Sequence, residues 1–336
     1  MRRILYIQIF FSFIILLIGT ISFLKFQDDR IIFERIIAQE DISIKNNNSL
    51  LLQDNQTEVS IHNKNTIVQL LANHLETKLN KSAIILKIVS DIPQSRALPN
   101  ASLINPSFHG IPKDAEIQKR QIFQNILSID KDFEVISYLM PNGDMYFQEP
   151  YSRQENLTRD NFALRDYYKG AVSTGDTYLG NVIISASSGL PVVLMSIPLY
   201  SSANDSSSSK ANHTENLIGL LGANQGISTF NKFLQSLPIS KNETAIYIDN
   251  NGQIIASSSS SPLSPINKQG QSNAGGNISS LQSFKDVISG KSGYNIENIN
   301  NKDMLIVYAP VKFKSTIWGV LFFSPLSNNN NNKSIT

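Results

Sequence analysis

The chain of 336 residues contains no cysteine. This absence excludes disulfides, thiolate metal sites and thiol nucleophiles together, so the fold depends on its core alone. Histidine is scarce as well, and no two of the four residues stand at the spacing of metal ligands. The sequence also lacks a G-x-S-x-G turn, a Gly-rich phosphate loop with its lysine and an HExxH helix. We therefore predict no enzymatic activity, no cofactor and no metal site.

Neither sign of charge is in excess, since the 29 basic side chains are balanced by 27 acidic ones. A basic patch or a strongly positive domain would indicate a nucleic-acid partner, and the balance gives no such indication. Asn and Ser are abundant instead, and N-x-S/T triplets mark possible glycan sites on an exported surface. An Asn- and Ser-rich chain also generates such triplets by chance. They begin at Asn47, Asn55, Asn80, Asn100, Asn156, Asn204, Asn212, Asn242, Asn277 and Asn332.

Long apolar runs are absent except at residues 4–24. About 20 such residues span a bilayer as a helix. Arg2 and Arg3 precede the run, so the positive-inside rule predicts a cytoplasmic N-terminus and an extracellular position for the rest. A cleaved signal peptide is the alternative, but its apolar core is normally about 7–15 residues long and ends at a small-residue cleavage site. We expect an uncleaved, single-pass anchor that holds the protein in the lipid of the cell membrane through residues 4–24.

A long helix is predicted beyond the anchor. Apolar residues recur at helical spacing between residues 67 and 92, and Pro93 ends the pattern. A free coiled-coil stalk would need more heptads than are present, so we expect this helix to pack along the body of the protein. A shorter amphipathic helix is predicted for residues 114–127. The apolar stripe of the long helix consists of Val68, Leu71, Leu75, Leu79, Leu86 and Val89.

The remaining chain contains the same order of patterns twice. Residues 133–147 are typical of a strand, an Asn-Gly turn and a second strand, which is the strongest short-range indication of a hairpin, and residues 244–256 repeat this pattern. The strand pattern of residues 191–198 returns at residues 304–310. The copies lie about 100–115 residues apart, far more than the 20–50 residues of solenoid repeats, which indicates two related domains.

Each copy is typical of an antiparallel sheet with helices on one side, which makes the fold α+β. A Ser- and Asn-rich surface loop is expected at residues 201–216 within the first copy. The predicted boundaries are 1–29 for a cytoplasmic stub and the anchor, 30–95 for a stalk and the long helix, 96–235 for a membrane-distal domain, 236–326 for a membrane-proximal domain and 327–336 for a disordered tail.

Residues 162–200 carry the candidate ligand site. Arg165, Tyr167 and Tyr168 lie within four positions, just before a Gly-rich turn and two strand-like runs. An arginine offers a rigid fork of donors suited to carboxylates, and a tyrosine offers a flat apolar face with a polar tip. Such groups bind a small polar ligand and do not cut bonds. Adjacent residues of a helix point in different directions, so we expect one tyrosine to face a pocket and the other to be structural or at its rim.

Simpler interpretations compete with these assignments. Arg165 could form an exposed ion pair with Asp160 or Asp166, because such pairs are common on protein surfaces. Tyr138 lies on a predicted strand, where it would line the cavity or, more simply, pack in the core.

In its order of elements the chain resembles a double Cache extracellular sensor region, with a single-span anchor, a long helix and two tandem PAS-like sheets. The resemblance covers roughly residues 30–326 and includes the R-x-Y-Y segment. It implies that the membrane-distal domain binds a small ligand. In the amino-acid-sensing branch of the family, an arginine and a following aromatic residue hold the ligand carboxylate. The resemblance assigns this role to Arg165 and Tyr167, and it assigns Tyr168 to the side of the ligand amine.

Two positions depart from that pattern. The family's aromatic residue five positions before the arginine is Asp160 here, and its aspartate after Gly222 and Ala223 is Asn224. An amide can accept a hydrogen bond from an ammonium but cannot neutralise its charge, and a desolvated ammonium without a counter-charge is costly. We therefore predict weak binding of amino acids, or a ligand such as a carboxylate without an amine, unless Asp160 or Asp176 points inward.

These observations predict a membrane-anchored extracellular sensor module for an amino acid or an organic carboxylate, which acts through a membrane signalling partner or as a homodimer. A ligand-free cell-envelope interaction protein and a tethered solute-binding protein for a transporter are the alternatives. Apolar side chains filling the pocket around Arg165 would favour the interaction protein, and an open, polar cavity would favour sensing.

Overall fold

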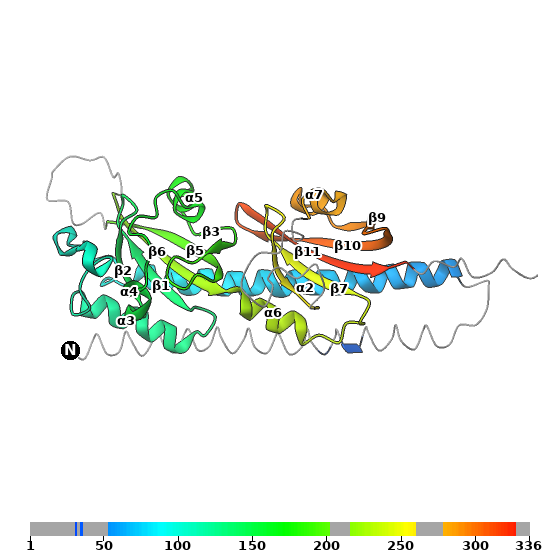
Figure 1. Cartoon of the computed structure of the whole chain (residues 1–336), viewed down its shortest axis with the longest axis horizontal. Coiled ribbons are helices and arrows are strands. Elements are labelled where there is room, and N and C mark those ends of the chain that lie inside the picture. The colour runs from blue at the N-terminus through cyan, green and yellow to red at the C-terminus, as the bar shows by residue number, and fades with distance from the viewer. Residues whose placement is uncertain (1–30, 32–33, 36–52, 202–215, 260–277, 327–336) are drawn as a thin grey trace, which may run out of the picture. The chain divides into compact units, whose positions relative to one another are not determined.

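The computed structural model describes residues 53–201, 216–259 and 278–326, together with residues 31, 34 and 35 (Figure 1). The predicted anchor, most of the predicted stalk, the Ser- and Asn-rich loop and the predicted tail lie outside the described residues, as do several of the N-x-S/T triplets. Among the helices in the described ranges, none combines the length and the apolar character needed to cross a membrane.

The chain divides into two compact units. Of the described residues, the first unit contains Thr77–Thr229 together with Lys314–Thr316, and the second contains those up to Glu76, Phe230–Phe313 and those from Ile317 onward. Each unit is built on one antiparallel sheet. The α+β class with two antiparallel sheets, predicted from the repeated patterns, is therefore confirmed.

The sheet of the first unit has the strand order β2-β1-β6-β5-β3, and β4 pairs with β5 beside β3. The two long central strands, β5 and β6, pair along nearly their whole length. The predicted hairpin is present as β1 and β2. The strands are β1 (Val135–Leu139), β2 (Met145–Glu149), β3 (Tyr178–Leu179), β4 (Ile183–Ile184), β5 (Pro191–Tyr200) and β6 (Leu217–Gly226).

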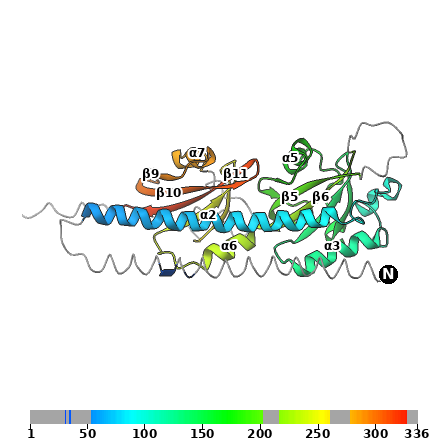
Figure 2. The ribbon, with the colours of Figure 1, turned by 180° about the vertical axis from the view of Figure 1, so that it is seen from behind.

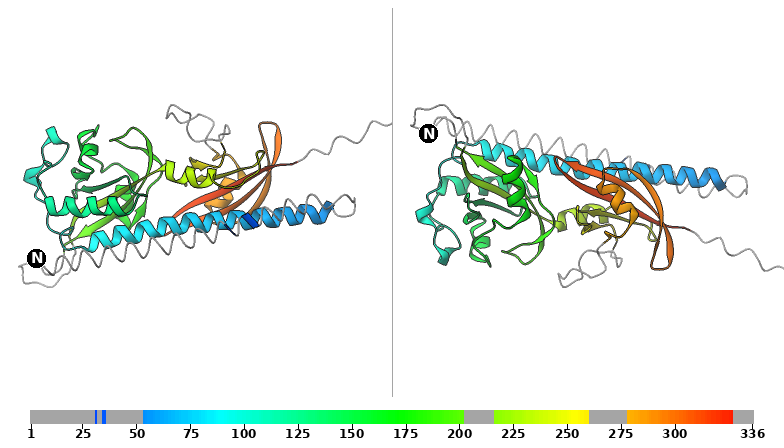
Figure 3. Two further views of the ribbon diagram at one scale, coloured as in Figure 1. Left: turned by 90° about the horizontal axis from the view of Figure 1, so that it is seen from below. Right: turned by 90° about the horizontal axis from the view of Figure 1, so that it is seen from above.

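Helices cover both faces of this sheet. Figures 1 and 2 show α3 on one face and α5 on the other, and the views from below and above in Figure 3 show first α3 and then α5 in front of the sheet. The expectation of helices on one side only is therefore wrong for this unit, because the short α5 is too brief to stand out as a separate layer in the sequence. The helices are α2 (Gln53–Asp91), α3 (Ile117–Ile129), α4 (Tyr151–Glu155) and α5 (Asp166–Thr174).

The second unit repeats the topology with the strand order β8-β7-β11-β10-β9. Its sheet packs on α7 (Gln282–Ile288) through a cluster of buried residues that includes Phe284 and Val287. The helix α6 (Ile227–Gln235) connects β6 to β7 along the chain. The strands are β7 (Thr244–Ile248), β8 (Ile254–Ser257), β9 (Gly293–Ile299), β10 (Lys302–Phe313) and β11 (Thr316–Pro325).

The apolar stripe predicted for the long helix is buried at every position, because all six of its side chains are at most 1% exposed. The helix starts well before the predicted residue 67, at Gln53, and ends at Asp91 as the proline at position 93 requires. Its residues up to Glu76 belong to the second unit, where Leu71 accepts a hydrogen bond from the Tyr247 hydroxyl, and its later residues belong to the first unit.

A buried polar network ties the segment before α3 to the first sheet. The Arg120 guanidinium forms an ion pair with Glu149 at 2.6 Å, and both side chains are at most 3% exposed. The same guanidinium donates to the carbonyls of Ile111 and Pro112, each at 3.2 Å. Gln154 donates to the Ile111 carbonyl at 2.9 Å. The loop that precedes α3 is thus held to the edge strand β2 by charge-assisted hydrogen bonds.

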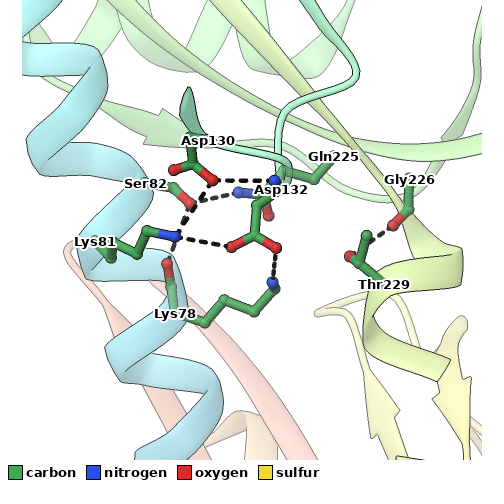
Figure 4. A network of polar contacts seen from close by, with 8 residues as sticks. All are labelled: Lys78, Lys81, Ser82, Asp130, Asp132, Gln225, Gly226 and Thr229. Atoms are coloured by element: carbon green, nitrogen blue, oxygen red, sulfur yellow. Dashed lines mark hydrogen bonds and ion pairs between the residues drawn. The ribbon is translucent and has the colours of Figure 1, made fainter. Parts of the chain in front are cut away.

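A second network, shown in Figure 4, joins α2 to the first sheet. Lys78 and Lys81 project from α2 toward Asp132, and Lys81 lies 3.1 Å from the Asp132 carboxylate. Lys81 also pairs with Asp130 at 3.3 Å. Ser82, one residue further along α2, accepts a hydrogen bond from the buried Gln225 side chain of β6. These contacts fix the position of α2 along this sheet.

Replacing Arg120 by alanine is expected to lower the free energy of unfolding by about 3–5 kcal/mol, because the Glu149 carboxylate would stay buried without its counter-charge. The matched control is Lys87→Ala in the exposed pair of Lys87 with Asp91, where a loss of at most about 1 kcal/mol is expected. Urea unfolding followed by circular dichroism measures both values. Equal losses would contradict the structural role of the buried pair.

The Asp132 pair predicts a dependence of stability on pH. Burial alone would raise the pKa of Asp132, but the ion pairs with Lys78 and Lys81 outweigh it and hold the pKa below its ordinary value of 3.8. The ion pairs of Asp132 therefore contribute their full stabilisation at any pH above the ordinary pKa of 3.8. This stabilisation is lost as the pH falls through the lower pKa that Asp132 has in the folded state. We expect Asp132→Asn to be less stable than the wild type at pH 7 and to lose less stability on acidification below about pH 4.

Urea titrations at a series of pH values test this expectation. The exposed Asp114 forms no ion pair within the described part of the chain, so Asp114→Asn serves as the control and is expected to keep the wild-type slope. An Asp132→Asn profile parallel to that of the wild type would show that the carboxylate contributes nothing to the acid response.

Candidate functional site

A cavity lies between the first sheet and the segments around α5. It contains about 360 Å³ of space not filled by protein atoms, part of it open to solvent. Its wall is mixed in character. The polar residues are Ser137, Gln148, Arg165, Tyr167, Ser185, Ser187 and Asn224, and the apolar ones are Leu139, Met145, Leu157, Phe162, Ile183, Ala186 and Leu194.

The register of the sheet decides which strand residues reach the cavity. Successive side chains of a strand point to opposite faces, and residues paired across strands share a face. Asn224 of β6 pairs with Leu194 of β5, so both line the cavity. Ser137 of β1 pairs with Gly222, where a Cβ atom would approach the Ser137 hydroxyl to 2.8 Å. The glycine therefore keeps the floor of the cavity close to the backbone.

The same alternation removes Tyr138 from the site. Tyr138 lies between Ser137 and Leu139, which line the cavity, so its ring points to the opposite face of the sheet. It is fully buried there, and its hydroxyl donates to the Ile218 carbonyl at 3.3 Å. The predicted ligand contact of Tyr138 is thus wrong in this structure, and the simpler expectation of core packing describes the residue.

Arg165 is the N-cap of α5 and has an extended backbone conformation. Its side chain forms part of the cavity wall. The side chain is half-buried, and its Nη2 atom lies 3.5 Å from the Ile184 carbonyl, at the limit of a hydrogen bond. Within the described residues, its Nε atom is buried without a hydrogen-bond partner, and no ion pair of Arg165 is found. The surface pairs with Asp160 or Asp166 considered above do not form in this part of the chain.

The two tyrosines have different surroundings. Tyr167 is 3% exposed and lines the cavity. Burial raises the pKa of Tyr167 well above its ordinary range, so its hydroxyl stays protonated at neutral pH. Tyr168 is also buried but is not part of the cavity wall, and its hydroxyl donates to the Pro141 carbonyl at 2.5 Å. One tyrosine therefore faces the cavity, and the other anchors α5 to the β1–β2 turn.

The aspartates that could have replaced a missing counter-charge point elsewhere. Asp160 is exposed and lies 2.6 Å from the His109 ring nitrogen. Asp176 is exposed as well and pairs with Lys314 at 2.5 Å. Neither lines the cavity. Their inclusion among the ligand contacts is therefore not supported by the geometry, because each is held by a basic partner outside the site. Asn224, in contrast, is 8% exposed, lines the cavity and keeps a buried Oδ1 atom with no partner among the described residues.

Besides Ser137, three further polar residues of the wall were not predicted from the sequence. Gln148 donates to the Ser187 hydroxyl at 3.3 Å, and the hydroxyls of Ser185 and Ser187 lie 3.2 Å apart. They come from β2 and from the turn between β4 and β5. The sequence holds only one indication of these residues. Ser185 and Ser187 are two positions apart in a turn beside a predicted strand, so their side chains could share one side of the turn.

The comparisons with known proteins agree with this architecture. The profile of the Cache domain family matches residues 51–328. A comparison with curated protein sequences finds no significant match. Similar solved structures include ligand-binding domains of bacterial chemoreceptors, and their sequence identity is low enough that they show the fold alone.

Three of these structures illustrate the likeness. The Pseudomonas fluorescens receptor CtaA with L-isoleucine has a TM-score of 0.53 and 16% identity, over 81% of this chain and 95% of that one. The Pseudomonas aeruginosa receptor PctB with L-Arg has a TM-score of 0.55 and 13% identity, over 83% of this chain and 100% of that one. The receptor PctC of the same organism, with GABA, has a TM-score of 0.51 and 14% identity, over 79% of this chain and 99% of that one.

The different surroundings of the tyrosines predict different losses of stability. Tyr168→Phe removes the hydrogen bond to Pro141 and is expected to lower the free energy of unfolding by about 1 kcal/mol. Tyr167→Phe is expected to cost less, because no hydrogen bond of its hydroxyl is found in the described ranges. Urea unfolding of the two matched variants measures the difference. A larger loss for Tyr167→Phe would contradict the assignment of Tyr168 as the anchor.

Proposed function

Because this chain belongs to the Cache domain family, we propose that its first unit binds a small, carboxylate-bearing solute outside the cell and that the protein works as a sensor. The observation that carries the proposal is the Arg165 guanidinium, which lines a partly open cavity with a buried Nε atom that has no partner among the described residues. A carboxylate is the group whose geometry a guanidinium fork matches best.

The composition of the cavity wall supports binding over a purely structural role. A ligand pocket combines apolar surface with polar groups that fix the orientation of the ligand, and this wall contains both kinds of residue. In the proposed complex, Arg165 binds the carboxylate and the Tyr167 hydroxyl adds a second donor. A cell-envelope interaction protein that had lost its ligand would be expected to fill the hollow with apolar side chains.

A relay toward the membrane is part of the proposal. Asn224 and Gln225 are neighbours on β6, and they point to opposite faces of the sheet. Asn224 lines the cavity, whereas Gln225 donates to Ser82 of α2 (Figure 4). A ligand that shifts β6 would therefore act on the helix directly, and it can shift the equilibrium only by its difference in affinity for the two positions. We propose that residues 4–24 anchor the chain and that a membrane partner or a second copy receives the signal.

The proposal predicts ligand-dependent stabilisation that requires Arg165. A thermal-shift screen of the full chain in detergent against amino acids and small organic acids is expected to raise the unfolding temperature for at least one carboxylate, because a bound ligand stabilises the folded state. Arg165→Ala is expected to weaken that ligand about 10- to 100-fold, since a charge-assisted hydrogen bond contributes about 1.5–3 kcal/mol.

Lys131→Ala is the matched control, because it removes the same charge from an exposed residue that does not line the cavity. We expect its affinity for the ligand to stay within about threefold of the wild type, as for other exposed charges. Equal weakening by both substitutions would indicate a general effect of charge, and the absence of any stabilising carboxylate would refute the proposed function.

A further inference from the structure

Two buried polar atoms of the cavity lack a hydrogen-bond partner within the described residues, the donor Nε of Arg165 and the acceptor Oδ1 of Asn224. Buried polar groups in folded proteins are normally paired with protein groups, ordered water or a ligand, so each of these two atoms can pair with a molecule bound in the cavity. Other polar groups of the wall have partners: Gln148 donates to Ser187, and the Ser137 hydroxyl donates to the Gly222 carbonyl at 3.4 Å. With the Tyr167 hydroxyl, for which no hydrogen bond is found among the described residues, the cavity therefore offers one cationic donor, one neutral donor and one neutral acceptor.

The charge of the wall is as informative as its hydrogen bonds. Among the described residues that line the cavity, none is an aspartate or a glutamate. The acidic residue nearest to Arg165 in sequence, Asp166, accepts a hydrogen bond from the Asn181 backbone at 2.7 Å, and Asp160 and Asp176 are paired with His109 and Lys314. An ammonium group bound here would meet a guanidinium and no counter-charge. Desolvating it under these conditions is unfavourable.

We propose, on the basis of the function proposed above, that the ligand is a 2-hydroxy monocarboxylate with an apolar side chain. Its carboxylate accepts from Arg165, and its hydroxyl donates to Asn224 Oδ1 without bringing a charge. Its side chain packs against apolar residues of the same wall, which include Leu139, Met145 and Leu194. The hydroxyl is the group that separates this ligand from an amino acid of the same shape, and Asn224 is the residue that determines the preference.

Isothermal titration of the full chain in detergent with matched probes tests the proposal. L-leucine, L-2-hydroxy-4-methylpentanoate and 4-methylpentanoate differ only in carrying an ammonium, a hydroxyl or a hydrogen at one carbon. L-alanine, L-lactate and propionate repeat the comparison with a smaller side chain. In at least one series we expect the hydroxy acid to bind at least tenfold more tightly than the amino acid. We expect it to bind about fivefold more tightly than the unsubstituted acid, which carries hydrogen at the same carbon, because the hydroxyl adds one neutral hydrogen bond.

Variants at position 224 sharpen the test. Asn224→Leu keeps the branched shape and the number of heavy atoms of the side chain without the acceptor, and it is expected to bind the hydroxy acid only as tightly as the acid that carries hydrogen at the same carbon. Asn224→Asp supplies a counter-charge, and it is expected to bind the amino acid more tightly than the hydroxy acid. Unfolding temperatures without ligand control for damage to the central strand. The comparison of the three probes on the wild type needs no variant and decides the proposal even if both variants misfold.

The possible outcomes separate this inference from the proposed function. If an amino acid binds the wild type as tightly as its hydroxy counterpart, and Arg165→Ala removes that binding, the ligand class is wrong and the sensor function stands. If the hydroxyl adds no affinity over hydrogen, the role of Asn224 is wrong. If none of the six probes binds, this inference is overturned, and the broader screen then decides whether the sensor function falls with it.

Discussion

The alternation of side chains along β6 is the constraint on which the rest of the first unit depends. A strand can present one residue to a cavity and the next to a helix only because its pleat has a period of two. Asn224 and Gln225 occupy such adjacent positions, so a one-residue slip of β6 would exchange the residue that lines the cavity for the one that contacts α2. The long pairing of β6 with both β1 and β5 prevents that slip. Register, more than any single side chain, therefore defines the site.

Much of the fold could be predicted because it depends on local patterns that repeat. The Asn-Gly turn of residues 141–144 predicted a hairpin, and the apolar stripe of residues 67–92 predicted a helix that the structure contains with its stripe fully buried. The position of α5 could not be predicted in the same way. Whether a nine-residue helix covers the upper or the lower face of a sheet depends on strand order, and strand order is a property of the whole unit.

The candidate site shows the same division. Arg165 and Tyr167 were found because a cation and an aromatic residue stood close together in one short segment, and both line the cavity. Tyr138 was misplaced because every residue of β1 is buried, so the sequence of this strand does not show which of its side chains share the face of the cavity. Asp160 and Asp176 were misjudged because their partners, His109 and Lys314, lie 51 and 138 positions away (160 − 109 and 314 − 176). Pairing over such distances cannot be read from spacing.

The burial of Ser82 has a consequence for the biosynthesis of the protein. Ser82 is the third residue of the triplet that begins at Asn80, and its hydroxyl is fully buried in α2 against Gln225. Asn80 itself is exposed. An oligosaccharide transferase that has to reach the hydroxyl of Ser82 cannot do so once α2 has packed against the sheet. Any sugar on Asn80 must therefore be attached to the nascent chain, before the first unit has folded.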